Sequence, residues 1–447
     1  MKIKNVLSAF LIAALIAVST GGCNITDIGS DSLLRPPKTM GDEAEIEQLI
    51  ADTAKHGYTL KYPKSGSYRS AIIMSDLDGD GVDEAVAFYR EGEDVARVHM
   101  LVMYSDENEW KLSSDNITET TDIDSVDFAD ISGSDTLEIL VGYSTYTQNI
   151  NLLSCYSYSD GKTEEINAGQ KYSAFYCGDF NSDEKDEVMT LSLYTSENEA
   201  NASMLEYNEK KKSLYSKAVV AMDPNVIKYR NVVTSDIGSA TQGIYVDGEF
   251  ATGEINTQII YYNKELSLLR NPLYKEKTKN FTQRNCNVIC ADIDNDMSVD
   301  FPSVQKLPHS EKEPAETVAD KITWNSFSAE NESFVPKCSM IANYSFGFTI
   351  KMPDSWIADS VTAINSTKEN STAFYEWKKS ALGNKLFEIK VFDSAEWEKG
   401  RDNDEYTLIY KDNRYAYAFI NSDTDSQYAM TDDEIKKSFA VLTETSV

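Results

Sequence analysis

The sequence is poor in basic residues and in histidine. Of its 447 residues, 42 are Lys or Arg and 73 are Asp or Glu, so the net charge is −31. This charge argues against nucleic acid or an anionic lipid surface as a partner, because both would repel the chain. His56, His99 and His309 lie far apart in the sequence, so they do not form the close ligand set of a zinc site.

The sequence also lacks a disulfide framework and familiar catalytic motifs. Apart from Cys23, five cysteines remain without regular spacing, and we predict that they are free thiols. No Gly-rich phosphate loop, nucleophile elbow or His-Glu-x-x-His motif is present. A pair of carboxylates that hydrolyses glycosidic bonds is still an alternative, because the separation of acidic side chains cannot be read from a sequence. We therefore expect a non-enzymatic protein.

The N-terminal apolar run is too short to span a membrane. Residues 6–18 follow a basic segment and lead to Cys23, which is the layout of a signal peptide. The residues before Cys23 resemble the lipobox of bacterial lipoproteins, although Thr20 stands where that pattern prefers Leu. The resemblance implies a diacylated Cys23 that anchors the chain on the extracellular face of the cell membrane. Plain signal-peptidase cleavage is the alternative.

The next segment, residues 24–57, is predicted to be a tether followed by a short helix. Its first part has no periodicity and includes two consecutive prolines. Ile46, Leu49, Ile50 and Ala54 then share one helical face, and Gly57 ends the pattern. We expect this helix to pack against the rim of the following domain.

One loop has the pattern of a site for a hard cation. In Asp76-Leu-Asp78-Gly-Asp80-Gly-Val82-Asp-Glu84, side-chain oxygens occur at every second position, and Gly81 permits a sharp turn. Ca²⁺ takes six to eight oxygens, of which a backbone carbonyl at Val82 can supply one. The loop is not an EF-hand, because Ala87 stands where that loop has its closing Glu and a strand-like run follows.

The loop recurs with a period near fifty residues. Its first residue returns every 49 to 57 positions, at Asp76, Asp130, Asp179, Asp236 and Asp292. A Tyr follows the first four of these Asp residues by 26 to 28 positions, at Tyr104, Tyr158, Tyr207 and Tyr262. A period of this length with four short strands per unit indicates a β-propeller, whose blades bury their faces against neighbouring blades.

These loops resemble the FG-GAP/VCBS repeats of bacterial surface proteins and of integrin α-subunit propellers. The resemblance covers roughly residues 58–338 and implies that each loop joins two strands of a blade and binds Ca²⁺. The whole layout also resembles lipoproteins of Gram-positive anaerobic bacteria. We therefore expect a mainly β fold. It would be one closed β-propeller of about five four-stranded blades with Asp-rich calcium loops, followed by a smaller α+β domain.

Three of the five loops keep enough oxygens for a structural Ca²⁺. The loop at Asp130 has serines in place of carboxylates, and the loop at Asp236 keeps only its first ligand. Glu184 and Met297 replace the turn glycine in two of the remaining loops. The predicted ligands are Asp76, Asp78, Asp80, Val82, Glu84, Asp179, Asn181, Asp183, Lys185, Glu187, Asp292, Asp294, Asp296, Ser298 and Asp300.

The repeat ends near residue 338, and the remaining chain has a different pattern. Residues 344–356 are similar to the start of PsbP-like domains. Several strand-like runs follow, and Thr431 and Glu434 form a capping box before a last helix. The predicted domains are a signal peptide (1–23), the tether and helix (24–57), the propeller (58–338) and an α+β domain (339–447).

Two functions follow from this organisation. The first is a membrane-anchored extracellular lipoprotein whose calcium-stabilised propeller binds an unknown protein or glycan at the cell envelope. The second is an envelope polysaccharide hydrolase or lyase that uses an acidic cleft on the propeller. Two carboxylates that face each other across a central pocket would favour the second.

Overall fold

The computed structural model describes residues 40–442, except 55, 93, 95, 108, 239, 240, 358, 401–404, 423 and 424. The predicted signal peptide, Cys23 and the tether lie outside the described residues. The described chain is mainly β and forms six antiparallel sheets, with three helices. None of these helices is both long enough and apolar enough to cross a membrane.

Sheet 1 follows α3 (Met40–Thr53), which matches the predicted short helix. Its central strand β3 pairs with β1, β2 and β4, and β5 pairs with β4. The strands of sheet 1 are β1 (Tyr58–Leu60), β2 (Ile72–Ser75), β3 (Glu84–Glu91), β4 (Val98–Asp106) and β5 (Glu109–Thr118).

Sheets 2, 3 and 4 each have four strands that pair in sequence order, as expected for propeller blades. Sheet 2 contains β6 (Asp122–Ala129), β7 (Glu138–Ser144), β8 (Asn151–Ser159) and β9 (Lys162–Tyr172). Sheet 3 contains β10 (Ala174–Gly178), β11 (Glu187–Ser192), β12 (Asn201–Asn208) and β13 (Ser213–Ala221). Sheet 4 contains β14 (Val226–Asp236), β15 (Gln242–Phe250), β16 (Ile255–Asn263) and β17 (Leu268–Arg270).

Sheets 5 and 6 complete the chain. Sheet 5 contains β18 (Phe301–Lys306), β19 (Asp320–Ser328), β20 (Ser333–Asn343), β21 (Phe348–Lys351) and β27 (Phe439–Val441). Sheet 6 contains β22 (Val361–Ser366), β23 (Ser371–Lys378), β24 (Ala381–Asp393), β26 (Tyr415–Asn421) and β25 (Thr407–Lys411). The two short helices are α4 (Ser394–Lys399) and α5 (Asp432–Ser438), and Thr431 and Glu434 form the predicted capping box of α5.

Neighbouring sheets pack face to face through apolar side chains. Successive side chains of a strand point to opposite faces, so one strand can serve two cores. Along β3, Val86 and Phe88 belong to the core between sheets 1 and 2. Ala85, Ala87 and Tyr89 lie in a second core that includes α3. Further cores join sheets 2 and 3, sheets 3 and 4, and sheets 4 and 5.

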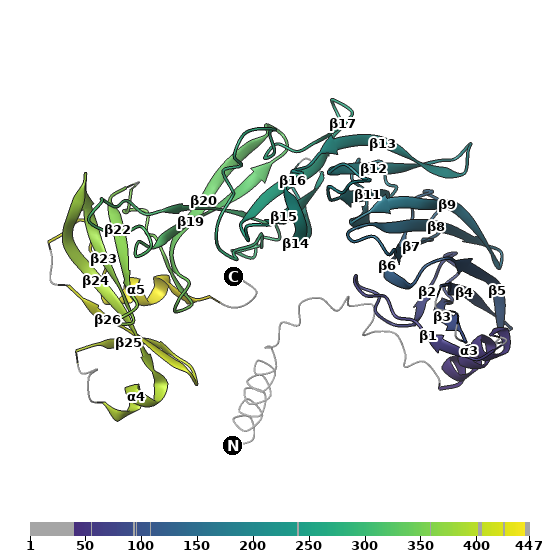
Figure 1. Cartoon of the computed structure of the whole chain (residues 1–447), viewed down its shortest axis with the longest axis horizontal. Coiled ribbons are helices and arrows are strands. Elements are labelled where there is room, and N and C mark those ends of the chain that lie inside the picture. The colour runs from purple at the N-terminus through teal and green to yellow at the C-terminus, as the bar shows by residue number, and fades with distance from the viewer. Residues whose placement is uncertain are drawn as a thin grey trace, which may run out of the picture.

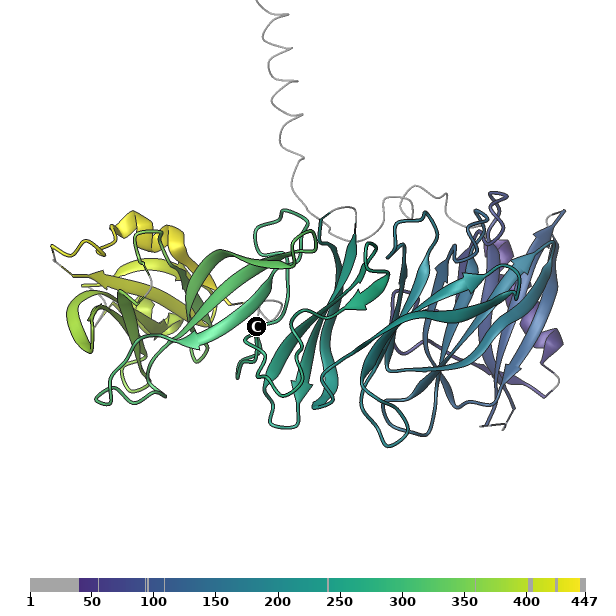
Figure 2. The same cartoon turned by 90° about the horizontal axis from the view of Figure 1, so that it is seen from above.

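The six sheets follow an open arc, so the closed ring that we predicted is wrong (Figures 1 and 2). Sheets 1 and 6 lie at opposite ends of this arc. The outer face of sheet 1 is covered by Ile46 and Ile50 of α3. At the other end, sheet 5 packs on sheet 6 through a core that includes Phe348 and Phe387. Because both end sheets are covered in this way, they need no ring closure to bury their apolar faces.

Sheet 5 contains strands from both sides of the predicted domain boundary. β20 runs across residues 338 and 339, and β21 pairs with both β20 and the last strand, β27. The C-terminal segment therefore shares a sheet with the repeats, and the division of the chain into domains stays a prediction. The five cysteines in the described residues are free, as predicted.

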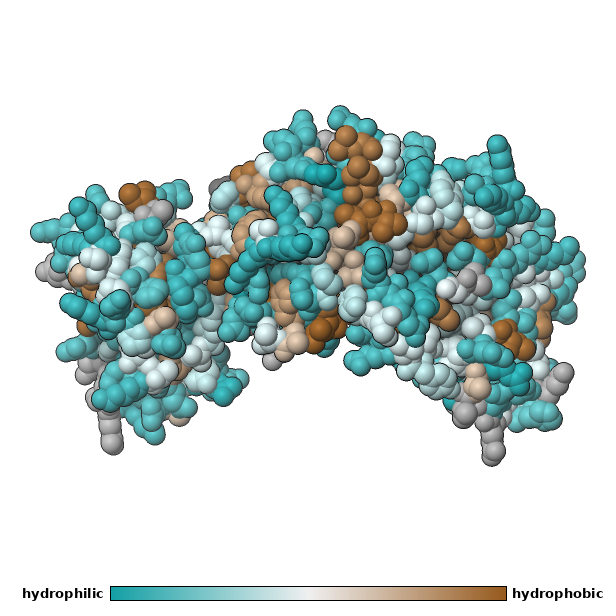
Figure 3. Space-filling model, turned by 45° about the horizontal axis from the view of Figure 1, so that its top comes forward, coloured by the Kyte–Doolittle hydropathy of each residue, from teal (hydrophilic) through white to brown (hydrophobic). Residues whose placement is uncertain are grey.

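Most of the visible surface is hydrophilic (Figure 3), as expected from the composition. One group of apolar side chains lies on the outer edge around β17, where Leu266 and Leu268 are exposed.

Candidate metal loops and a cavity on the concave side

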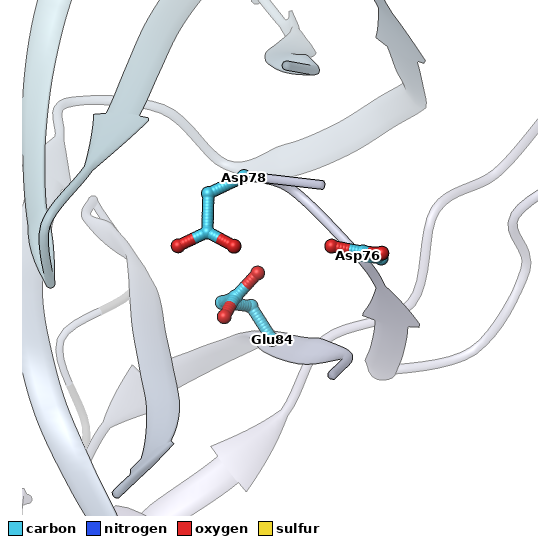
Figure 4. Close-up of side chains that lie close together, drawn as sticks. All are labelled: Asp76, Asp78 and Glu84. Carbon is cyan, nitrogen blue, oxygen red and sulfur yellow. The ribbon is translucent and has the colours of Figure 1, made fainter. Parts of the chain in front are cut away.

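The first Asp loop brings three carboxylates together between β2 and β3. Asp76 follows β2, Glu84 begins β3, and Asp78 faces Glu84 from the turn between them (Figure 4). One oxygen from each of the three side chains lies within 4.8 Å of the others. Oxygens that bind one Ca²⁺ at 2.3–2.6 Å lie at most about 5 Å apart, so this set fits a shared calcium ion.

Backbone hydrogen bonds hold this turn in place. Asp76 accepts hydrogen bonds from the backbone N–H groups of Gly79 at 2.8 Å and Gly81 at 3.0 Å. Both glycines have a positive φ, of 76° and 88°, which a side chain would disfavour. Asp80, a predicted ligand, instead accepts the N–H of Val82 at 2.7 Å and is not one of the three grouped carboxylates.

The three grouped carboxylates of the first loop carry like charges at short range. Among the described residues, no ion pair reaches Asp76, Asp78 or Glu84. Burial, together with the nearby Asp side chains, raises the pKa of Glu84 to about 7, against a hydrogen bond from Leu77 that lowers it. Burial and then Asp80 also raise the pKa of Asp78. A divalent cation would relieve this repulsion.

The glutamate that ends each of the first three loops has a second role, which the sequence analysis did not predict. Glu84 Oε2 accepts the backbone N–H of Leu77 at 2.8 Å. Glu138 and Glu187 accept the equivalent N–H groups of Ile131 and Phe180, each at 3.0 Å. Each of the three glutamates therefore forms a hydrogen bond across its loop, and this bond stabilises the loop whether or not a metal ion is bound. The same spacing of seven residues in all three loops was the available signal.

The third loop places an amide among its carboxylates. The side-chain N–H₂ of Asn181 donates to Glu187 and, at 3.1 Å, to Asp183. Asp179 accepts the backbone N–H of Asp183 at 3.0 Å. The side chain of Lys185 turns away to Glu209, at 3.0 Å. Burial and then Asp183 raise the pKa of Glu187 to about 8.

The fifth loop groups Asp292, Asp294 and Asp300, again with one oxygen from each within 4.8 Å of the others. Asp296 accepts the N–H of Ser298 at 2.9 Å, which repeats the Asp80–Val82 bond of the first loop. Unlike the first loop, this loop is reached by a basic side chain, that of Lys337.

The second and fourth loops differ from the other three in having fewer carboxylates, as their sequences indicate. In the second loop, the hydroxyl groups of Ser132 and Ser134 lie 2.7 Å apart, and that of Ser134 lies 2.8 Å from Thr136. These hydroxyl groups are satisfied by one another. In the fourth loop, Asp236 accepts the N–H of Gly238 at 2.7 Å, and the following residues 239 and 240 lie outside the described residues.

Neighbouring loops also bond to each other. The N–H of Leu137 in the second loop donates to the carbonyl of Leu77 in the first at 2.8 Å. The N–H of Asp130 donates to the side chain of Asp186 in the third loop at 3.1 Å. Order in one loop therefore bears directly on the packing of the next sheet.

A cavity of about 670 Å³ is lined by residues of sheets 2, 3 and 4 and by Ser65 and Gly66 from the loop between β1 and β2. The strands β6 and β14, which line it, lie along the concave side of the arc (Figure 1). The cavity wall comes mainly from the first strands of sheets 2, 3 and 4, which lie about fifty residues apart in sequence. Aromatic rings, amides and hydroxyl groups dominate the wall, including Phe175, Tyr176, Tyr229, Asn149, Asn151, Asn231, Ser125 and Ser173. Its charged residues are Asp124, Lys228 and Arg230.

Two of these charged side chains have partners. Asp124 accepts the hydroxyl group of Tyr172 at 2.7 Å, and Arg230 donates to Asn287 at 2.9 Å. Asp124 is the one carboxylate in the wall, so a facing carboxylate pair is not found in this cavity. Sequence reasoning missed the cavity because its lining residues come from separate repeats and have no common motif.

A buried polar cluster joins sheet 4 to the segment that follows β17. The side chains of Asp247 and Arg284 are both fully buried, and their charged groups lie 2.8 Å apart. Asp247 also accepts the N–H of Cys290 at 2.7 Å and the hydroxyl group of Thr257 at 2.7 Å. Burial raises the pKa of Cys290 well above its usual range, so this thiol is not an activated nucleophile. The cluster holds the irregular segment in place.

Comparisons with known proteins give no family. No protein-family model matches the sequence, and no curated protein matches it either. The chain is similar to Sqt1 of Saccharomyces cerevisiae at 10% identity, over 80% of this chain and 86% of that one, with a TM-score of 0.31. The Dos1 propeller matches at 9% identity over 82% and 81%, with a TM-score of 0.31. A rhamnogalacturonan lyase of Bacillus licheniformis matches at 11% identity over 62% of each chain, with a TM-score of 0.25. TM-scores this low assign neither fold nor activity.

Proposed function

We propose that this protein is an extracellular lipoprotein, anchored through Cys23, whose arc of sheets binds a glycan at the cell envelope in the concave cavity. The cavity is the observation that supports this function. Its volume of about 670 Å³ lies within the range of small-ligand sites, which is about 300–1,000 Å³. Its aromatic rings offer flat apolar surfaces for sugar rings, and its amides and hydroxyl groups offer partners for sugar hydroxyls. A protein ligand is the other outcome of the test below.

Calcium is proposed as a structural ion of the first loop. The grouping of Asp76, Asp78 and Glu84 and their like charges at short range support this assignment. Bound between β2 and β3, the ion would fix the turn that contacts the second loop. It would have no part in ligand chemistry, because all three carboxylates would be ligands of the ion.

A glycan array tests the binding site. The chain from residue 24 onward keeps every described residue and is the protein to use. Lys228→Ala and Asn149→Gly alter the cavity wall; Asn149 has a φ of 63°, which glycine adopts freely. Each change should weaken binding of the best glycan at least tenfold. Lys211→Ala, in the exposed turn after β12, is the matched control and should bind like the parent.

Three outcomes separate the alternatives. Loss of glycan binding in the cavity variants alone supports the proposal. Equal binding by all variants would place the site elsewhere. No glycan binding, together with capture of an envelope protein that the cavity variants lose, would make the ligand a protein.

The alternative, a polysaccharide hydrolase or lyase, requires product release from the bound glycan. Glycoside hydrolysis commonly uses two carboxylates, and the cavity wall offers Asp124 alone. Release of shorter or unsaturated oligosaccharides that stops in Asp124→Asn would establish the enzyme and overturn a pure binding role.

The anchor is tested separately. Cys23→Ala should release the protein from the membrane fraction or leave it unprocessed, because the acyl chains attach to that sulfur. Fractionation and migration identical to the parent would contradict the lipoprotein assignment.

A further inference from the structure

Lys337 reaches from β20 into the fifth Asp loop. Its Nζ lies 2.6 Å from Asp296 and 2.9 Å from the nearer oxygen of Asp294. It also lies 3.4 Å from Asp300, the residue immediately before β18. The ammonium group therefore contacts three of the loop's carboxylates, two of which belong to the group that could hold a metal ion.

Asp300 explains why a cation is needed at this position. Its side chain has no exposed area, and its Oδ1 has no hydrogen-bond partner among the described residues. Unless it takes up a proton, a buried carboxylate without a counter-charge strongly destabilises a folded protein, and either a metal ion or a basic side chain can supply that charge. The Lys337 side chain is itself only 20% exposed, and its ammonium group lies 3.4 Å from Asp300.

The first loop provides the contrast. It has the same grouping of carboxylates, but among the described residues no basic side chain pairs with them. In the fifth loop, by contrast, the ammonium group of Lys337 lies within 3.4 Å of Asp294, Asp296 and Asp300.

From this contrast we infer that Lys337 is the built-in cation of the fifth loop, so that this loop needs no Ca²⁺ whereas the first loop does. An ammonium group and a calcium ion that share the same oxygens would repel each other at short range. The inference rests on the calcium assignment proposed above and revises the ligand set predicted from the sequence, since Asp292, Asp294, Asp296, Ser298 and Asp300 would then bind no metal in the parent protein.

Calcium stoichiometry tests the inference. The parent chain from residue 24 onward, Lys337→Met and Lys171→Met are compared by equilibrium dialysis with ⁴⁵Ca²⁺. Met keeps most of the apolar stem of Lys and removes its charge. Lys337→Met should bind one more ion than the parent, and Asp294→Asn in that variant should remove the additional ion. Lys171 pairs with Glu197 outside the Asp loops, so Lys171→Met should leave the stoichiometry unchanged.

A second measurement covers the case in which Lys337→Met folds poorly. Its melting temperature should fall relative to the parent in chelator, and a larger part of that loss should return on addition of calcium. A parent that binds no calcium would overturn the calcium proposal itself. A parent that binds calcium, loses one ion in Asp294→Asn and gains none in Lys337→Met would overturn the role of Lys337 alone.

Discussion

At the scale of single residues, the fully buried pair of Asp247 and Arg284 joins segments that are far apart in the chain. The predicted ligands of one loop are only two residues apart, so a short stretch of sequence shows them as alternating Asp residues. Asp247 and Arg284 are 37 residues apart and belong to no motif, and only the packing of sheet 4 brings them together. The role of Lys337 was hidden for the same reason, because it reaches the fifth loop from a strand about forty residues later.

The buried pair gives the first prediction. Arg284→Met should lower the free energy of unfolding by about 3–5 kcal/mol, because it leaves the charge of Asp247 buried without a counter-charge. Urea unfolding of the chain from residue 24 onward measures the change. Lys171→Met, which breaks the exposed pair with Glu197, should cost less than about 1 kcal/mol.

A double variant separates the charge from the packing. Asp247→Asn removes the unpaired charge and keeps the shape of the side chain. Adding it to Arg284→Met should therefore recover part of the lost stability. If the double variant is less stable than Arg284→Met, an unpaired charge is not the cause of the loss.

The pKa of Glu84 gives a prediction for the calcium-free protein. Burial raises this pKa from 4.5 to about 7 in the folded chain. Between these values the folded state binds more protons than the unfolded state, so stability falls as pH rises through that window. In chelator, the parent should therefore lose stability relative to Glu84→Gln between pH 5 and pH 8. A stability difference between the two that does not change with pH would contradict the raised pKa.

At the scale of secondary-structure elements, the order of strands within a repeat was predictable from local signals. The second, third and fourth Asp loops each join the first two strands of a sheet, and Tyr158, Tyr207 and Tyr262 lie in the third strand. The first loop joins β2 to β3, with Tyr104 in β4, and the fifth loop precedes β18. The core positions of α3 were visible as well, since Ile46 and Ile50 share a helical face. The sequence pattern does not predict which surface this helical face packs against, because any apolar sheet face could pack against it.

The packing of α3 gives the third prediction. Ile50 is fully buried against sheet 1, so Ile50→Ala should lower the free energy of unfolding by about 2–5 kcal/mol. Glu47→Ala, on the exposed side of the same helix, should change it by less than about 0.5 kcal/mol. Equal effects would mean that α3 contributes by helix propensity and not by covering sheet 1.

At the scale of the whole molecule, the repeat predicts that successive sheets pack against each other. It does not predict whether the last sheet packs against the first. Ring closure requires that the last sheet covers the first. In this chain α3 already covers sheet 1, and sheet 6 covers sheet 5. Both covering elements lie outside the repeat, so a count of repeats cannot distinguish an arc from a ring. The concave cavity belongs to the same scale, because it needs the curvature of three sheets.

The open arc gives the last prediction, which small-angle X-ray scattering checks. Six sheets in an arc make a longer particle than the same sheets in a ring (Figure 1). The measured scattering curve should therefore match the curve calculated from the described residues, and the maximum dimension should be that of the arc. Because α3 occupies the face that a closing sheet would need, the arc should persist with calcium and with chelator. Ile50→Asp should instead expose the apolar face of sheet 1 and favour self-association through it, which size-exclusion chromatography would detect. A compact, disc-like scattering curve from the monomeric parent would show that the ring closes in solution and would overturn the capping role of α3.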